Sequence, residues 1–306
     1  MTRRSAAAAT ASIVCAMALT LVGLTPAQAA EAEPDPLALA SEVAPDQGEV
    51  VQPTNSAEGI TATVDDATIV LPDDASDAVE VSVPGTGEFT IPLPDATSAE
   101  AQLAEDGTVV FPATEDDGVT VLVQVLESDS VRIQTVVEEE GPSTFTYQFD
   151  DQFVPMTDPQ WNVVIADMSN PAEASVLMVD APWAIDAAGR DVATYYEVDG
   201  QSLVQVIVPD AATQFPVVAD PRWEWRSAGY GAALNRAETN GFASAQSAAA
   251  VCLLAGAWNI FAGAYCGALA GVLWAQASIA KEHRQCVFVQ IVPFPQVYRY
   301  TGGYCR

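Results

Sequence analysis

Short runs in which apolar and polar residues alternate cover much of the chain, from residue 59 to residue 208. In 131–137 and 144–149, one side of the run is apolar or aromatic and the other is polar, as a half-buried strand requires. Asp, Gly and Pro separate the runs, and Asp199-Gly200 is a two-residue hairpin signal. This spacing predicts an antiparallel β-sandwich or stacked sheet. The predicted strands are 60–64, 68–71, 79–83, 89–93, 108–111, 119–126, 131–137, 144–149, 161–165, 175–179, 192–198 and 202–208.

The pattern changes in 239–280, a stretch rich in Ala and Gly that contains no Asp, Glu, Lys, Arg or His. Gly263, Gly267 and Gly271 recur at every fourth position within it. On a helix this spacing places the three glycines in one groove, where another backbone can approach closely. We therefore expect helix packing along these glycines.

Two helices are predicted around this stretch. Asn235 can cap the first, with Glu238 reaching back to the cap, so that it runs over about 236–255. Residues 256–259 provide the break, and the second helix continues to about 284. Arg284 then lies in its last turn, where the helix dipole favours a cation.

Two interpretations of the uncharged stretch compete. A single helix over 251–275 is long enough to span a membrane. Alternatively, a helical hairpin is closed by a Cys252–Cys266 disulfide. On one continuous helix these cysteines lie about 21 Å apart, whereas a disulfide needs Cα atoms within about 7 Å, so the bond and the span exclude each other. A span would also place Cys286 and Cys305 in the cytoplasm, where disulfides are disfavoured, and we therefore favour the hairpin.

The last residues combine strand and turn signals. Residues 286–292 form a strand-like run, which Pro293 and Pro295 should exclude from the centre of a sheet. Residues 298–305 are predicted to be an irregular tail.

The amino end has the features of a secretory signal peptide. Arg3 and Arg4 precede an apolar run, and Ala27 and Ala29 form an Ala-x-Ala cleavage site, so residues 1–29 should be removed. An uncleaved anchor is the alternative. Residues 30–58 are rich in Ala, Glu, Pro and Asp and are predicted to be a disordered acidic leader.

Charge divides the remainder of the chain. Residues 31–221 hold 38 acidic residues against Arg132 and Arg190, whereas residues 222–306 hold seven basic and three acidic residues. So strong an acidic excess repels nucleic acid and anionic lipid, so nucleic acid is not an expected partner. Solubility outside the cell explains the acidic part, and a second explanation is that it screens the basic, apolar part. Composition, charge and cysteine use all change after 221, which gives domains at 59–221 and 222–306.

The cysteines and the single histidine limit the chemistry. Cys252, Cys266, Cys286 and Cys305 remain after signal cleavage, an even number that predicts two disulfides, of which Cys252–Cys266 with Cys286–Cys305 is one of three pairings. No C-x-x-C pair is present and His283 is the only histidine, so no metal site is predicted. The acidic clusters lack the ligand spacing of an EF-hand loop. Nucleophile motifs and phosphate-binding glycine loops are absent too, so no catalytic residue and no cofactor are predicted.

Three local motifs resemble those of a known group of proteins. They are Ala-Pro-Trp-Ala at 181–184, Pro-Val-Val-Ala-Asp-Pro at 216–221 and Asn-x-x-Glu-Thr at 235–239, the last followed by spaced cysteines. In this order they resemble a group of uncharacterised secreted proteins from actinobacteria, with an acidic β-rich region and a small cysteine-containing helical module. The resemblance implies a secreted, two-part protein and transfers no catalytic residue.

These observations predict an α+β multidomain protein: a β-sandwich-like antiparallel region, then a disulfide-bonded α-helical hairpin with short flanking strands. The expected function is that of a secreted, non-enzymatic protein of the cell envelope or extracellular space. Its helical module would carry the interaction, with membrane or envelope contact through 239–280. The alternatives are a membrane-active, bacteriocin-like module with an acidic pro-region, a single-pass membrane protein, and a hydrolase using His283.

Overall fold

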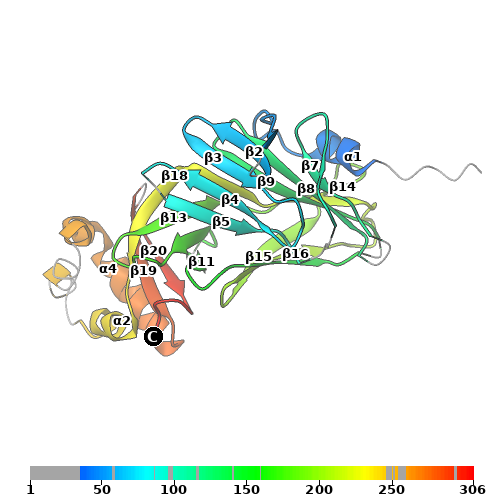
Figure 1. Cartoon of the computed structure of the whole chain (residues 1–306). Helices are drawn as coiled ribbons and strands as arrows, with labels where there is room; N and C mark the ends of the chain where they lie inside the picture. Colours follow the sequence, from blue (N-terminus) through cyan, green and yellow to red (C-terminus); the bar gives the residue numbers. More distant parts are fainter. Residues whose placement is uncertain are drawn as a thin grey trace, which may run out of the picture. The chain divides into compact units, whose positions relative to one another are not determined.

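The computed structural model consists mainly of antiparallel strands (Figure 1). It describes residues 35–306 except 57–58, 86, 96–98, 115–116, 140, 159, 246–249, 251, 254–259 and 293–294, and it does not describe the side chains of 226–228 and 260–268. The described helices are α1 (Pro36–Val43), α2 (Arg236–Ala243) and α4 (Ile260–Glu282). The signal-cleavage residues Ala27 and Ala29 lie outside the described residues.

The strands form three sheets. One has the order β1-β2-β3-β4-β5, another the order β10-β16-β15, and the third contains the remaining twelve strands. The bounds are β1 (Thr54–Ser56), β2 (Gly59–Val64), β3 (Ala67–Leu71), β4 (Ala78–Val83), β5 (Gly87–Pro92), β6 (Gln102–Leu103), β7 (Val109–Phe111), β8 (Val119–Leu126), β9 (Ser130–Val137), β10 (Thr144–Gln148), β11 (Phe153–Thr157), β12 (Val163–Asp167), β13 (Ala174–Val179), β14 (Ala184–Asp186), β15 (Ala193–Asp199), β16 (Ser202–Val208), β17 (Val217–Ala219), β18 (Arg222–Ala233), β19 (Cys286–Val292) and β20 (Gln296–Tyr300).

Six strands of the largest sheet close into a barrel. Their order is β13-β12-β11-β20-β19-β18, and β13 pairs with β18 to complete the ring. Three of these strands precede residue 221 and three follow it. Alternate residues from all six strands join one buried cluster, as expected for the interior of a small barrel. Its members include Val154, Met156, Val164, Ala166, Val176, Ala233, Phe288, Tyr298 and Tyr300.

Strand β19 is buried on both faces. Cys286 and Phe288 belong to the interior cluster, whereas Val287 and Val289 pack with Ala277 and other residues of α4 in a separate cluster. An uninterrupted apolar run is typical of such a strand. Helix α4 therefore covers the outside of the barrel.

This arrangement corrects the predicted fold class. The chain is 48% strand and 14% helix, and its carboxyl-terminal part completes a closed barrel instead of forming a disulfide-bonded helical hairpin. The described disulfide, Cys286–Cys305, joins the start of β19 to the residues after β20, with the Cα atoms 5.5 Å apart. Apolar burial accounts for the difference, because α4 buries Leu273, Ala277 and neighbouring residues against Val287 and Val289 of β19.

Several local predictions around this barrel can be checked. The Cys286–Cys305 pairing is confirmed, and so is the capping box of Asn235 and Glu238 at the start of α2. The prediction of an irregular tail is wrong for residues 298–300, because they belong to β20, which pairs with both β19 and β11, whereas residues 301–305 form no helix or strand. Pro295 lies in the connection between β19 and β20, so it does not prevent β19 from pairing on both sides.

The uncharged stretch is described in part. A Cβ atom at Gly271 would meet no atom within 4 Å, so the described residues do not support close helix packing there. Gly263 and Gly267, and the side chain of Cys266, lie outside the described side chains. Cys252 is disulfide-bonded. No helix in the described part of the chain is long and apolar enough to cross a membrane.

Order also begins earlier than composition predicts. Asp35 caps α1 by accepting a hydrogen bond from the backbone N–H of Leu37, and Pro36 occupies the first turn. Leu39 and Ala40 are buried against β8, β9 and β17. Apolar burial therefore orders a segment that was assigned to a disordered leader.

Candidate binding cleft

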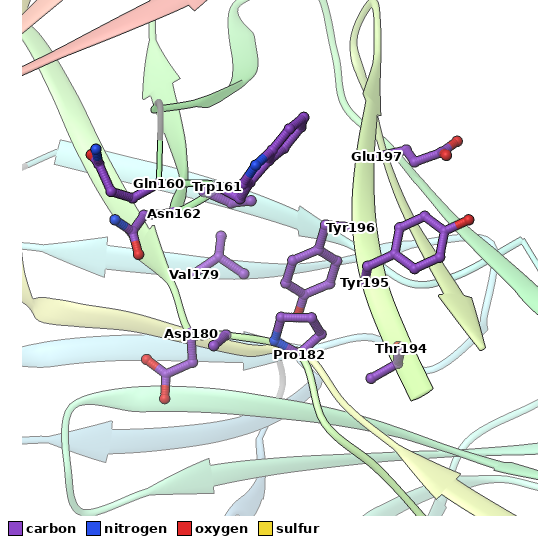
Figure 2. Close-up of a pocket in the computed structure, with 12 residues that line it drawn as sticks. Gln160, Trp161, Asn162, Val179, Asp180, Pro182, Thr194, Tyr195, Tyr196 and Glu197 are labelled. Atoms are coloured by element: carbon purple, nitrogen blue, oxygen red, sulfur yellow. The ribbon is translucent and has the colours of Figure 1, made fainter. Parts of the chain in front are cut away.

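An open cleft of about 550 Å³ separates the edge of the β10-β16-β15 sheet from the residues that flank β12 and β13 (Figure 2). Its volume lies in the range of small-molecule sites. Three segments line it: residues 160–163, residues 179–182 and residues 194–197 of β15.

Trp161 is the most exposed large apolar residue of this cleft. Its side chain is 76% exposed, and its φ of 67° lies in the left-handed region, which a bulky side chain rarely adopts. Exposing an indole and holding its backbone in this region both cost free energy. Surrounding contacts must therefore hold this residue in place.

Asp158 provides those contacts. Its side chain is buried, and its Oδ1 accepts hydrogen bonds from the backbone N–H groups of Gln160 and Asn162 at 2.8 and 2.9 Å. Its Oδ2 accepts from Asn162 Nδ2 at 2.7 Å and from Gln296 Nε2 at 2.6 Å. The backbone N–H of Trp161 also donates to the carbonyl of Asp158 at 3.1 Å. We call residues 158 and 160–162 the Trp161 turn.

Gln296 connects this turn to the carboxyl-terminal part of the chain. It is the first residue of β20, and its amide donates to Asp158, which directly follows the neighbouring strand β11. Closure of the barrel is therefore what brings together the two residues that fix the Trp161 turn.

The opposite wall is β15. Tyr195 is 46% exposed, whereas Tyr196 is 8% exposed and its hydroxyl has no hydrogen-bond partner among the described residues. In Figure 2 the Tyr196 ring lies between the Trp161 indole and the Pro182 ring. Burial, with a smaller contribution from the Asp220 carboxylate, raises the pKa of Tyr196 well above its usual value, so its hydroxyl stays neutral.

The two carboxylates of the cleft point away from each other, on opposite sides of it (Figure 2). Asp180 is engaged by Arg222, whose Nε and Nη2 lie 2.7 Å from its Oδ2. Glu197 lies on β15. None of the described lining residues is Lys, Arg or His.

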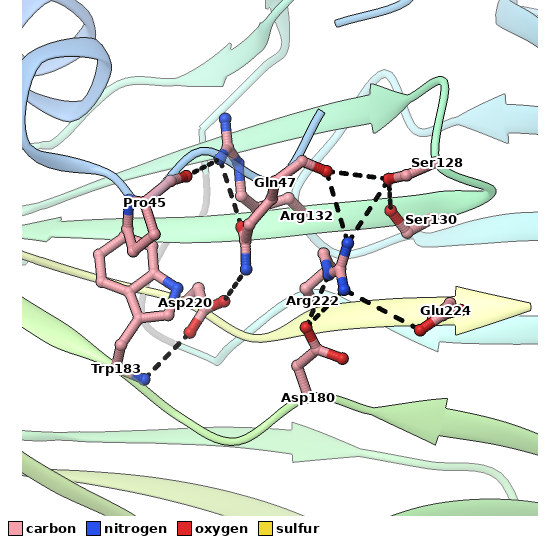
Figure 3. A network of polar contacts seen from close by, with 10 residues as sticks. All are labelled: Pro45, Gln47, Ser128, Ser130, Arg132, Asp180, Trp183, Asp220, Arg222 and Glu224. Atoms are coloured by element: carbon pink, nitrogen blue, oxygen red, sulfur yellow. Dashed lines mark hydrogen bonds and ion pairs between the residues drawn. The ribbon is translucent and has the colours of Figure 1, made fainter. Parts of the chain in front are cut away.

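A polar network adjoins the cleft through Asp180, which lines it, and through Trp183, which follows the lining residue Pro182 (Figure 3). Asp220 is fully buried, and it accepts hydrogen bonds from the backbone N–H of Trp183 at 3.3 Å and from Gln47 Nε2 at 3.5 Å. Burial raises the pKa of Asp220 to about 7. Gln47 also accepts a hydrogen bond from Arg132 Nη1 at 3.3 Å, so this residue of the amino-terminal segment connects Asp220 to Arg132.

The residues singled out from the sequence lie elsewhere. His283 is exposed just after α4 and does not line the cleft. The described residues contain no group of three or more His, Cys, Asp or Glu side chains able to hold a metal ion.

Sequence reasoning missed Trp161, Tyr195 and Tyr196, because it assigned all three to ordinary strands. A signal for the first was present. Asp158-Pro159 is a turn signal, and an aromatic residue directly after such a turn is a candidate for exposure.

Comparisons with known proteins do not assign the chain to a class: no protein-family model, no curated protein and no solved structure matches it. Its function must therefore be argued from the cleft itself.

Proposed function

We propose that this chain is a secreted, non-enzymatic binding protein of the cell envelope or extracellular space, and that the cleft at Trp161 takes its ligand. The observation that carries the proposal is the Trp161 turn. A buried carboxylate with four hydrogen-bond donors holds an exposed indole in an unfavourable backbone conformation. Backbone strain maintained in this way is typical of binding sites.

Two features support secretion. The amino end carries the basic, apolar and Ala-x-Ala pattern of a signal peptide. The Cys286–Cys305 disulfide is of the kind that persists in oxidising compartments. Mass analysis of the mature protein should find Ala30 as its first residue, and a chain that retains residues 1–29 would contradict secretion through this signal.

The geometry of the cleft supports binding without catalysis. General acid–base chemistry needs two groups that reach the same bond, whereas Asp180 is held by Arg222 and points away from Glu197. The only histidine lies outside the cleft.

The test is a binding screen of the full secreted chain against neutral oligosaccharides and cationic peptides, read by tryptophan fluorescence and checked for product formation. We expect a binder that is not turned over and that Trp161→Ala weakens. Trp274→Ala is the matched control, since Trp274 is 47% exposed on α4, outside the cleft. Binding lost in Trp274→Ala and retained in Trp161→Ala would place the interaction on the helix instead.

A specific observation favours that second candidate, contact with a membrane or envelope through 239–280. Val272, Trp274 and Ile279 on α4 are between 37% and 47% exposed. Exposed apolar side chains on a helix beside basic residues such as Lys281 are typical of membrane-surface contacts. Flotation with zwitterionic vesicles, which do not repel the acidic part of the chain, tests it: Trp274→Glu should abolish co-flotation, whereas absence of the wild-type chain from the vesicle fraction would refute it.

A further inference from the structure

The ligand class of the cleft can be argued one step further, on the basis of the binding function proposed above. We infer that the cleft binds a neutral carbohydrate, with one pyranose ring stacked on the indole of Trp161.

The shape of the exposed indole suits a sugar ring. A pyranose presents a flat face of C–H groups, which packs on the electron-rich face of an aromatic ring and removes apolar area from water on both sides. Trp161 offers such a face, 76% exposed and held by Asp158 before the ligand arrives. A fixed platform lowers the entropy cost of binding.

The polar groups around the indole suit sugar hydroxyls. Gln160, Asn162 and Thr194 contribute amides and a hydroxyl, and Glu197 a carboxylate. These groups donate to or accept from sugar hydroxyls. The bond from Asn162 Nδ2 to Asp158 orients that amide and leaves its oxygen available as an acceptor.

The charge of the cleft and of the chain favours a neutral ligand. The described lining contains no cation, and the whole chain has a formal net charge of −30, so sulfated, phosphorylated or uronic acid chains are repelled. Asp180 is neutralised by Arg222, which leaves Glu197 as the one unpaired carboxylate of the lining. A single carboxylate attracts a strongly cationic ligand only weakly, so a neutral ligand fits the cleft best.

A peptide is the competing occupant, because β15 is the edge strand of its sheet among the described strands. An added peptide strand would take its affinity from main-chain hydrogen bonds along β15. It would not need an indole fixed on the opposite wall. The Trp161 turn therefore favours the carbohydrate.

The experiment titrates the full secreted chain with neutral hexasaccharides of glucose, mannose and N-acetylglucosamine, a sulfated glucose hexasaccharide and an Arg-containing decapeptide. Calorimetry gives the affinities. At least one neutral sugar should bind, in the micromolar to millimolar range expected for an open cleft. Trp161→Ala should weaken it by roughly tenfold or more, Trp161→Phe by less, and Trp274→Ala should leave it unchanged.

Asp158→Asn is the positioning variant. Its Oδ1 still accepts from the backbone of the turn, but its new amide faces the donors of Asn162 and Gln296. Sugar affinity should fall about tenfold while the circular dichroism spectrum is retained. If the variant does not fold, Gln296→Ala removes one of these contacts alone and should weaken binding in the same direction.

The outcomes separate the two proposals. A decapeptide that binds through Trp161 when no sugar does overturns the carbohydrate inference and leaves the binding function standing. Tighter binding of the sulfated sugar overturns neutrality. If neither class binds, or if binding is indifferent to Trp161, both the inference and the function of the cleft are wrong.

Discussion

Two buried aspartates lie at opposite ends of one short strand pair, and their pKa values are shifted in opposite directions. β14 and β17 pair antiparallel, with Asp186 opposite Val217 at one end and Asp220 directly after β17 at the other. Asp186 is 1% exposed and accepts hydrogen bonds from the side chain of Arg190 and from the backbone N–H groups of Ala188, Arg190 and Gln214. Asp220 is equally buried but accepts two bonds of 3.3 and 3.5 Å.

Their pKa values diverge for this reason. Burial alone would raise the pKa of Asp186, but the Arg190 guanidinium and three backbone N–H groups lower it well below its usual range. At Asp220 burial dominates and raises the pKa to about 7. The comparison teaches that donor number, donor distance and a paired cation decide, together with depth below the surface, whether an interior carboxylate keeps its charge.

The largest loss of stability should come from replacing Asp186, the aspartate with more hydrogen-bond donors. Asp186→Ala leaves three backbone donors and one guanidinium without their acceptor, and it should lower the free energy of unfolding by about 4 kcal/mol at pH 7. Urea denaturation measures this. Asp186→Asn keeps one acceptor oxygen and should lose less. If both variants lost the same free energy of unfolding, the hydrogen bonds to Asp186 would not be the source of its contribution to stability.

Asp220 should make the protein less stable as the pH rises, which is the opposite of the usual effect of a carboxylate with a lowered pKa. Its folded pKa of about 7 lies above the unfolded value of 3.8, so its contribution is complete below about pH 4 and is lost as the pH rises to about 7. Relative to Asp220→Asn, the wild type should lose on the order of 3 kcal/mol between pH 4 and pH 8. Denaturation of both proteins across that interval checks it. Parallel profiles for the two would refute the raised pKa.

A smaller loss of stability should follow from removing Gln47, which donates a hydrogen bond to Asp220. Gln47→Ala removes a donor to Asp220 and an acceptor for Arg132, and it should cost about 1–2 kcal/mol. Gln52→Ala is the control from the same segment, since its exposed amide bonds a single backbone carbonyl, and it should cost less than about 0.5 kcal/mol. A cost in the control as large as in Gln47→Ala would mean that the segment, and not the network, supplies the stability.

The smallest effect on stability should come from a change that leaves both ends of the strand pair intact. Trp161→Gly removes an exposed side chain and relieves the positive φ, so it should leave stability unchanged or raise it by about 0.5–1 kcal/mol. Thermal unfolding measures it. A clear loss would show that the indole is a structural residue and would weaken the case for the cleft.

Local features could be predicted wherever neighbouring residues decide them. The hairpin at Asp199-Gly200 is confirmed, with Asp199 opposite Ser202 and Gly200 at a φ of 62°. The Asn235–Glu238 capping box depends on residues three positions apart, and alternation of apolar residues marks most of the strands of residues 59–208.

Features that join distant segments could not be predicted. Thr157 of β11 pairs with Arg299 of β20, more than a hundred residues later, and no local pattern indicates that pairing. The opposite pKa shifts of the two buried aspartates could not be predicted from the sequence either. Asp186 and Asp220 are both acidic residues near turns in the sequence, and nothing local separates the charged one from the one with the raised pKa.

The sequence by itself determined the strand-rich character of residues 59–208 and the first turn of α2, because short-range periodicity and capping are local. Cysteine count predicted two disulfides but left three pairings open, and the structure selected Cys286–Cys305. The tertiary structure alone decided that the carboxyl-terminal strands close a barrel with β11–β13, that α4 covers it, and that Gln296 and Asp158 together hold Trp161. The physical reason is that apolar burial and hydrogen-bond satisfaction depend on which distant surfaces meet, and that choice is made by the whole fold.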